Sequence, residues 1–96
     1  MRRRYVVTYD IRDPKRLRRT FKVLRDFGEH LQLSVFECLL NAMELTDLQD
    51  QLGEVIHHGE DQVLFFDLGR AESDAGLRIT AMGAAYEPKS VQAVVV

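Results

Sequence analysis

Apolar residues follow strand-like patterns in five stretches of the chain. Residues 4–10 form a nearly continuous apolar run rich in Val and Tyr, which is typical of a central strand covered on at least one face. Residues 31–40 form a second strand region, and the pattern fits one long strand or two short strands with a bend. Residues 62–68 and 77–82 predict two further strands, and the valine-rich end, 91–96, fits a fifth.

Helical periodicity separates the first two strand regions. Asp13 followed by Pro14 provides an N-cap and a proline at the first helical position, and Gly28 predicts the end of the helix. Between these ends, apolar residues at steps of four, three and three positions form one stripe that we expect to face the core. The stripe consists of Leu17, Phe21, Leu24 and Phe27.

A second helix is predicted to begin at Asn41, because Glu44 stands three residues later and the pair resembles a capping box. The apolar residues that should face the core from this helix are Leu45, Leu48, Leu52, Val55 and Ile56. His57 and His58 fall in its predicted last turn. Imidazoles there interact well with the carbonyl end of the helix, and adjacent helical residues do not easily share a metal ion.

The order strand, helix, strand, helix, strand predicts an α+β fold of the ferredoxin-like type, an antiparallel sheet with two helices on one face. The chain of 96 residues should form a single domain, with its core in residues 4–69 and a dimerisation segment at about 77–96. Two helices cover only one sheet face, so a second copy of the chain is the simplest cover for the other. We therefore expect a homodimer to which the C-terminal strand contributes.

Positive charge is concentrated at the start of the chain. Ten of the thirteen Lys and Arg residues lie in the first 25 positions, although the whole chain carries a net charge of −2. Such a field attracts a polyanion, so the first partner to consider is a nucleic acid, DNA or RNA. The predicted nucleic-acid-binding residues are Arg12, Arg16, Arg18, Arg19 and Lys22, with Lys15 and Arg25 on the same segment. The alternative is a solvated helix face, but this face lacks acidic partners before Asp26.

Asp10 ends the first predicted strand and is the candidate catalytic and metal-binding residue. Hydrolysis of a phosphodiester needs stabilised phosphoryl oxygens and an activated water, which Mg²⁺ supplies when one or two carboxylates and several waters hold it. One Asp10 is a poor cage, but two copies related by a twofold axis would bring two carboxylates to one shared ion. Alternatively, Asp10 caps the strand end or pairs with Arg12. Asp13 is better explained as an N-cap than as a second ligand.

Three segments together resemble CRISPR-associated protein 2, the small partner of the integrase that acquires CRISPR spacers. They are Tyr9-Asp10-Ile11, Asp13-Pro14-Lys15-Arg16 and Gln32-Leu33-Ser34-Val35-Phe36-Glu37. The resemblance implies a homodimer of ferredoxin-like subunits, a magnesium site built on Asp10, and assembly on DNA with dimers of the integrase, CRISPR-associated protein 1. The residues that it places near the metal site or in support of it are Tyr9, Arg16, Arg19, Ser34 and Phe36. His30 departs from the family, in which an Arg often precedes the Gln-x-Ser segment.

Two function classes follow. In the first, the protein acts in spacer acquisition and is a magnesium-dependent endonuclease, of the endoribonuclease class, at paired Asp10 residues. In the second, the dimer is a non-catalytic scaffold that bridges DNA along its Arg-rich faces. A small-molecule-binding regulatory domain of the same fold is a third, more distant interpretation. Short apolar runs predict a cytoplasmic protein that does not enter a membrane, and Cys38, the single cysteine, should be a packed, inert thiol.

Overall fold

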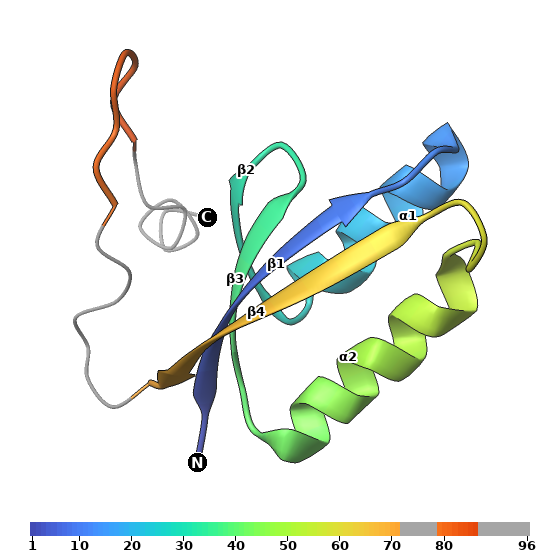
Figure 1. The fold of residues 1–96 in the computed structure, drawn as a ribbon, viewed down its shortest axis with the longest axis horizontal. Coiled ribbons are helices and arrows are strands. Elements are labelled where there is room, and N and C mark those ends of the chain that lie inside the picture. Colours follow the sequence, from blue (N-terminus) through green and yellow to red (C-terminus); the bar gives the residue numbers. More distant parts are fainter. Residues whose placement is uncertain (72–78, 87–96) are drawn as a thin grey trace.

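The computed structural model describes residues 1–71 and 79–86. Its elements are β1 (Arg3–Asp10), α1 (Pro14–Arg25), β2 (Gly28–Gln32), β3 (Val35–Leu40), α2 (Ala42–Val55) and β4 (Gln62–Arg70). The strands form one sheet in the order β2, β3, β1, β4, with every neighbouring pair antiparallel. Both helices lie on one face of this sheet, and the other face is turned toward the reader in Figure 1. The predicted α+β fold of the ferredoxin-like type is confirmed.

Residues 31–40 belong to two strands rather than one. β2 ends at Gln32 and β3 begins at Val35, so the turn falls at Leu33 and Ser34. Leu33 has a φ of 31°, a left-handed conformation that residues other than glycine seldom adopt. This turn lies beside the end of β1, because the Tyr9 amide donates to the Ser34 carbonyl at 3.1 Å.

The core lies between the sheet and the two helices, and alternation along β1 decides which side chains enter it. Tyr5, Val7 and Tyr9 point toward the helices and are buried. The other buried apolar residues of the core are Leu24, Phe36, Cys38, Leu40, Leu48 and Leu52. A large apolar side chain that is removed from water contributes about 1.5–3 kcal/mol to folding. This cluster therefore holds both helices against the sheet.

Gly28 does not end α1, contrary to the prediction from sequence. The helix ends at Arg25 with Asp26 as its C-cap, and Gly28 is the first residue of β2. A Cβ at this position would lie 2.6 Å from the Cys38 sulfur and would collide with the Glu37 carbonyl, so glycine is required by the approach of β3. The same packing buries Cys38, and burial raises the pKa of its thiol to about 12, as expected of an inert thiol.

Both predicted helix starts are confirmed. Asp13 caps α1 by accepting the Arg16 amide, and Asn41 with Glu44 forms the complete capping box of α2. The predicted apolar stripe of α1 is wrong at Leu17, whose side chain is exposed, while Thr20 is fully buried. The side of α1 that packs on the sheet carries Thr20 and Leu24. It is therefore rotated around the helix axis from the predicted apolar stripe, which included Leu17.

α2 ends at Val55, so the two histidines follow the helix instead of forming its last turn, which corrects the prediction. Ile56 is the C-cap and has an extended conformation, with a ψ of 158°, that stops the helix. His58 nevertheless interacts with the carbonyl end as expected, since its Nε2 lies 2.9 Å from the Gly53 carbonyl oxygen. His57 lies in the turn that leads to β4.

The strand predicted at 77–82 is absent where the structure describes it. Residues 79–82 pair with no strand, and the side chains of Ile79 and Met82 are 43% and 96% exposed. An apolar run becomes a strand only where a neighbouring strand pairs with it, which the local pattern cannot reveal. The tail predicted as a fifth strand, 91–96, lies outside the described residues. No helix in the described ranges is long and apolar enough to cross a membrane.

Candidate functional site

Asp10 is the last residue of β1 and lies on the open face of the sheet, opposite the helices. It pairs with Gln62 of β4 and is exposed. Strand alternation places its carboxylate on the same face as Val6 and Thr8. Within residues 1–71 and 79–86 this carboxylate makes no hydrogen bond and no ion pair, so the alternative of a pair with Arg12 is not observed. The Asp10 carboxylate is accessible to a ligand.

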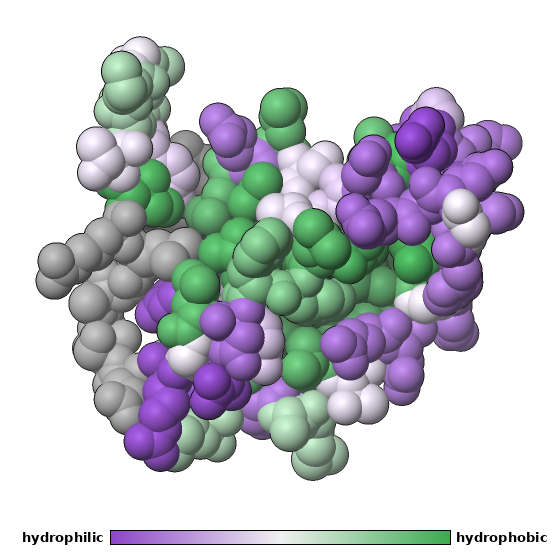
Figure 2. Space-filling model, viewed as in Figure 1, coloured by the Kyte–Doolittle hydropathy of each residue, from purple (hydrophilic) through white to green (hydrophobic). Residues whose placement is uncertain are grey.

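The open face beside Asp10 carries exposed and partly exposed apolar side chains, which we call the open-face patch. Its members are Val6, Leu39, Leu64, Phe66 and Leu68, from three neighbouring strands. The side chains of Leu64, Phe66 and Leu68 are 42%, 48% and 51% exposed. Figure 2 shows a hydrophobic area in the middle of this face, bordered by hydrophilic side chains. Contiguous apolar surface with a polar border is typical of a protein interface.

Tyr9, Ser34 and Phe36, which the family resemblance placed around Asp10, do lie together at the end of β1. The Tyr9 ring centroid is 6.2 Å from that of Phe36, and the Tyr9 hydroxyl donates to the Leu33 carbonyl at 3.4 Å. Burial raises the pKa of the Tyr9 phenol. Its side chain points to the helices, away from the Asp10 carboxylate, so these residues fix the backbone of the strand end.

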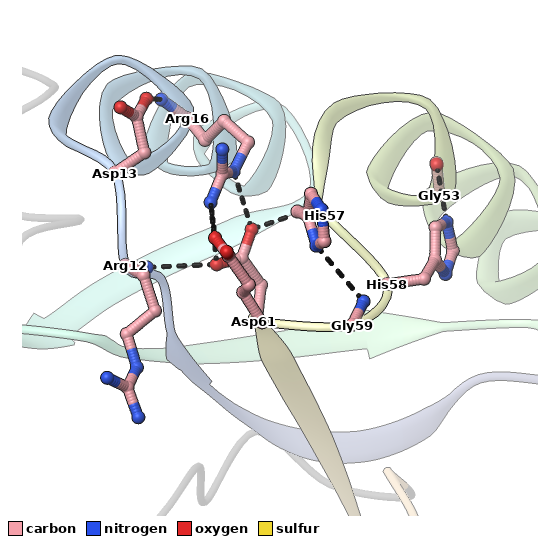
Figure 3. A network of polar contacts seen from close by, with 9 residues as sticks. Arg12, Asp13, Arg16, Gly53, His57, His58, Gly59 and Asp61 are labelled. Carbon is pink, nitrogen blue, oxygen red and sulfur yellow. Dashed lines mark hydrogen bonds and ion pairs between the residues drawn. The ribbon is translucent and has the colours of Figure 1, made fainter.

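Asp61 is the centre of a polar network beside the loop between β1 and α1 (Figure 3). Its side chain has 0% exposed surface. The Arg12 amide donates to Oδ1 at 2.9 Å, and the His57 amide donates to Oδ2 at 2.8 Å. The hydrogen bond from Arg16, helped by these amides, holds the pKa of the Asp61 carboxyl well below its usual range. Because Arg12 follows Asp10 by two residues, the network fixes the loop that leaves the strand.

Arg16 is held by this network rather than free in solvent. Its Nε donates to Asp61 Oδ2 at 2.7 Å, and its Nη2 lies 3.2 Å from Asp61 Oδ1 and 3.2 Å from Glu60 Oε1. A two-point contact between guanidinium and carboxylate is strong and directional. Arg12 behaves differently, because only its amide contacts Asp61 and its side chain points away from the network (Figure 3).

Folding also neutralises part of the basic segment at the start of the chain. Arg2 pairs with Glu44 at 2.8 Å, and Arg3 pairs with Asp67 at 3.1 Å. Arg4 pairs with Glu37 across β1 and β3 on the open face. The acidic partners come from the later, negatively charged part of the sequence, so the field of the folded protein is weaker than the charge separation along the sequence suggests.

Arg18, Arg19 and Lys22 are exposed on α1 and form no ion pair with other described residues. Arg18 and Lys22, together with Arg25, line a groove of about 480 Å³ between α1 and the β2–β3 turn. Arg19 does not line this groove. The predicted nucleic-acid-binding residues therefore have three different surroundings. Arg16 is bound to Asp61, Arg18 and Lys22 line the groove, and the side chains of Arg12 and Arg19 are exposed to solvent.

Among the described residues, no three His, Cys, Asp or Glu side chains come together in a way that could hold an ion. At the end of β1, Asp10 offers an exposed carboxylate that has no partner in the described ranges. One hard oxygen ligand fits Mg²⁺, which keeps several waters and accepts one or two carboxylates. A metal site with further protein ligands would need side chains from outside the described part of this chain.

Sequence reasoning missed Asp61 and assigned no role to His30. Asp61 stands next to Glu60 before an apolar strand, where a carboxylate usually marks an ordinary turn, and no local signal reveals its distant partner. His30 contacts the Leu33 carbonyl through Nε2 at 2.7 Å and packs edge-on against Phe21 at 5.0 Å. Its ring therefore belongs to the β2–β3 turn.

Fold and site together define a class of protein: a small ferredoxin-like domain with an exposed strand-end aspartate, an apolar open sheet face and a cationic helix. The family described as CRISPR associated protein Cas2 matches residues 1–75. The chain is 41% identical over 92 residues to the CRISPR-associated endoribonuclease Cas2 of Geobacter sulfurreducens, and the match covers 96% of each chain. This chain belongs to the Cas2 family, as its motifs indicated.

Solved structures agree with this assignment. A hypothetical protein from Thermus thermophilus superposes with a TM-score of 0.74 at 32% identity, covering 91% of this chain and 100% of the other. Cas2 of Streptococcus pyogenes, crystallised at pH 6.5, superposes with a TM-score of 0.71 at 33% identity, covering 83% of this chain and 99% of the other. The described sheet and helices are thus the fold of this family.

Proposed function

We propose that the protein acts in CRISPR spacer acquisition as a homodimer that binds nucleic acid and hydrolyses phosphodiester bonds, as an endoribonuclease, at paired Asp10 residues. The observation that carries the proposal is the position of Asp10, which is exposed on the same sheet face as the open-face patch. Family membership and the endoribonuclease name of the Geobacter sulfurreducens relative support the reaction class.

The open-face patch supports the homodimer. Burying half-exposed side chains such as Phe66 and Leu68 gains about 25 cal/mol for each Å² of apolar surface removed from water. A second copy that packs through the same face would cover both patches, as an isologous interface requires. Asp10 ends β1 on this face, so the two carboxylates would approach each other at the edge of such an interface.

The chemistry of the Asp10 carboxylate fits Mg²⁺, because it is a hard oxygen ligand that no described side chain occupies. Two copies would supply two carboxylates to one ion, and waters would complete its coordination. A bound Mg²⁺ polarises a phosphoryl oxygen and lowers the pKa of a coordinated water. In this arrangement Asp10 holds the ion, while Tyr9 and Asp61 keep the strand end and the following loop in position.

The exposed cations of the first helix region support nucleic-acid binding. Arg12, Arg18, Arg19 and Lys22 have no ion-pair partner in the described ranges and can contact phosphates. Such contacts position a nucleic acid without reading its sequence. The same cations would serve the assembly with dimers of the integrase, CRISPR-associated protein 1, on DNA.

A non-catalytic bridge is the second candidate function. The observation that favours it is that Asp10 stands alone, since no other carboxylate joins it in the described part of the chain. Several phosphate-contacting cations with a single candidate carboxylate fit a scaffold at least as well as a catalyst. In this case the dimer would hold duplex DNA and integrase dimers at a fixed spacing.

Asp10→Asn separates these functions, because the substitution keeps the shape of the side chain and removes its charge. Asp50→Asn is the matched control, since it removes an exposed carboxylate on α2 away from the site. Purified proteins are tested for magnesium-dependent cleavage of RNA and DNA, and for dimer formation by sedimentation. Cells that carry each variant are tested for spacer acquisition.

An endoribonuclease built on Asp10 should lose a factor of about 10² or more in cleavage rate in the Asp10 variant, with the dimer retained. The Asp50 variant should cleave like the wild type. Cleavage at the wild-type rate by the Asp10 variant would end the nuclease proposal. Normal spacer acquisition by a cleavage-dead variant would leave the bridge as the working function.

A further inference from the structure

The groove between α1 and the β2–β3 turn has no role in the proposed catalytic site. Its volume is about 480 Å³, within the range of ligand pockets. Its apolar walls come from Tyr9, Leu17 and Phe21, and Leu33 of the turn forms its lip. Leu17 was expected in the core, yet its side chain is 38% exposed and faces this groove.

Leu33 presents an apolar side chain to solvent from a strained backbone. The side chain is 84% exposed, and its φ of 31° is unfavourable for a residue with a Cβ. The Leu33 carbonyl is fixed from two sides, by the Tyr9 hydroxyl at 3.4 Å and by His30 Nε2 at 2.7 Å. Strain of this kind persists where the surroundings impose it, and it is concentrated at binding sites.

Cations form one wall of the same groove. Arg18, Lys22 and Arg25 follow one another at steps of four and three along α1, so they share a helix face. None of them has an ion-pair partner in residues 1–71 and 79–86. Arg25 lies 5.9 Å from the centre of the Phe21 ring, which brings the charged wall into contact with the apolar one.

The occupant must therefore combine apolar groups with negative charge. Phosphates would match the cations, but a nucleotide base in the groove needs partners for its polar edge. The Tyr9 hydroxyl is already bound to the Leu33 carbonyl, and Ser34 is the only other uncharged polar residue among those that line the groove. Burying a base edge without hydrogen bonds is costly. Apolar side chains of a peptide have no such requirement.

We propose that this groove binds an acidic, amphipathic peptide segment of a partner protein. Apolar side chains of the segment would pack on Phe21 and Leu33, and its carboxylates would pair with Lys22 and Arg25. The cations from Arg18 to Arg25 span about 10 Å along the helix, so two turns of a helical segment suffice. An acidic segment in the groove would compete with nucleic acid for Arg18 and Lys22.

The test begins with random peptides displayed on phage and selected on the purified full chain. Selected peptides are then synthesised with a fluorophore, and their dissociation constants are measured by polarisation. Leu33→Asn removes the apolar lip, adds no charge, and suits the left-handed backbone because Asn tolerates it. Met43→Asn is its control, since Met43 is 83% exposed on α2. Arg25→Glu reverses the charged wall, and Lys15→Glu makes the same change on α1 outside the groove.

We expect the selected peptides to be rich in Asp and Glu together with Leu, Met or Phe. Their affinity should fall tenfold or more in both groove variants and change less than twofold in both controls. Failure to select any peptide, or binding that survives Leu33→Asn, would overturn the proposal. A tenfold loss of RNA or DNA affinity in Leu33→Asn would assign the groove to nucleic acid instead.

Discussion

The Arg16 guanidinium and the Asp61 carboxylate meet across 45 positions of the chain, with Nε 2.7 Å from Oδ2 and Nη2 3.2 Å from Oδ1. This contact joins the first turn of α1 to the residue before β4. Asp61 also holds the Arg12 amide at 2.9 Å. The loop that follows Asp10 is therefore tied to two separate elements of the fold.

Asp61→Asn should destabilise the protein, because it removes the charge that balances Arg16 and turns an acceptor oxygen into a donor nitrogen. We expect the melting temperature to fall by about 5 °C or more, measured by circular dichroism. A double-mutant cycle with Arg16→Ala should show losses that are less than additive. Glu60→Gln is the control and should change little, since Glu60 is 57% exposed. Equal losses for the Asp61 and Glu60 variants would contradict the central role of Asp61.

Arg16 and Arg19 should differ in their effect on nucleic-acid binding. Arg19 is exposed on α1 without an ion-pair partner in the described ranges, whereas Arg16 is bound to Asp61. Arg19→Ala should reduce the slope of log affinity against log salt on duplex DNA by about 0.9 for each lost phosphate contact. Arg16→Ala should leave the slope unchanged at a temperature where it is folded. The reverse result would place the phosphate footprint at Arg16.

Glu44 should make stability depend on acid pH. The side-chain hydrogen bond from Arg2, together with the Asn41 amide, lowers the pKa of Glu44 from 4.5 to about 2. A carboxyl with a lowered folded pKa stabilises the protein above its unfolded pKa, and this contribution is lost as pH falls from about 4.5 toward 2. Urea unfolding at several pH values should show that Glu44→Gln, which keeps a capping box, differs from wild type at pH 7 but converges with it near pH 2. Glu54→Gln, an exposed site on the same helix, should run parallel to wild type.

Two glycine-to-alanine substitutions should change stability in opposite directions. Gly28→Ala places a methyl group 2.6 Å from the Cys38 sulfur, so overpacking should cost about 1–3 kcal/mol or more. Gly53→Ala meets nothing within 4 Å in the last turn of α2, where the backbone is still helical and alanine should add about 0.5–1 kcal/mol. Chemical denaturation measures both changes. A neutral Gly28 variant would show that β2 can move away from β3.

Local interactions determined much of this protein from sequence alone. The N-cap at Asp13 and the capping box of Asn41 and Glu44 act within four residues, so the start of each helix could be predicted. The apolar run at residues 4–10 likewise predicted a central strand, which is β1. The segments around Asp10 and Ser34 were sufficient to indicate the family.

Long-range packing decided the rest. Gly28 is needed because β3 passes close to it. The sequence of the helix gave no sign of this contact, so Gly28 was interpreted as the helix end although α1 ends at Arg25. The pairing of Arg16 with Asp61 depends on how α1 and the start of β4 meet, so the helix pattern alone grouped Arg16 with the predicted nucleic-acid-binding residues. Leu17 and Leu33 are exposed and line one groove because of the way α1 packs on the sheet. Their positions in the sequence could not reveal this groove. Sequence periodicity fixes which side chains share a face, but only the tertiary structure brings that face against its neighbours.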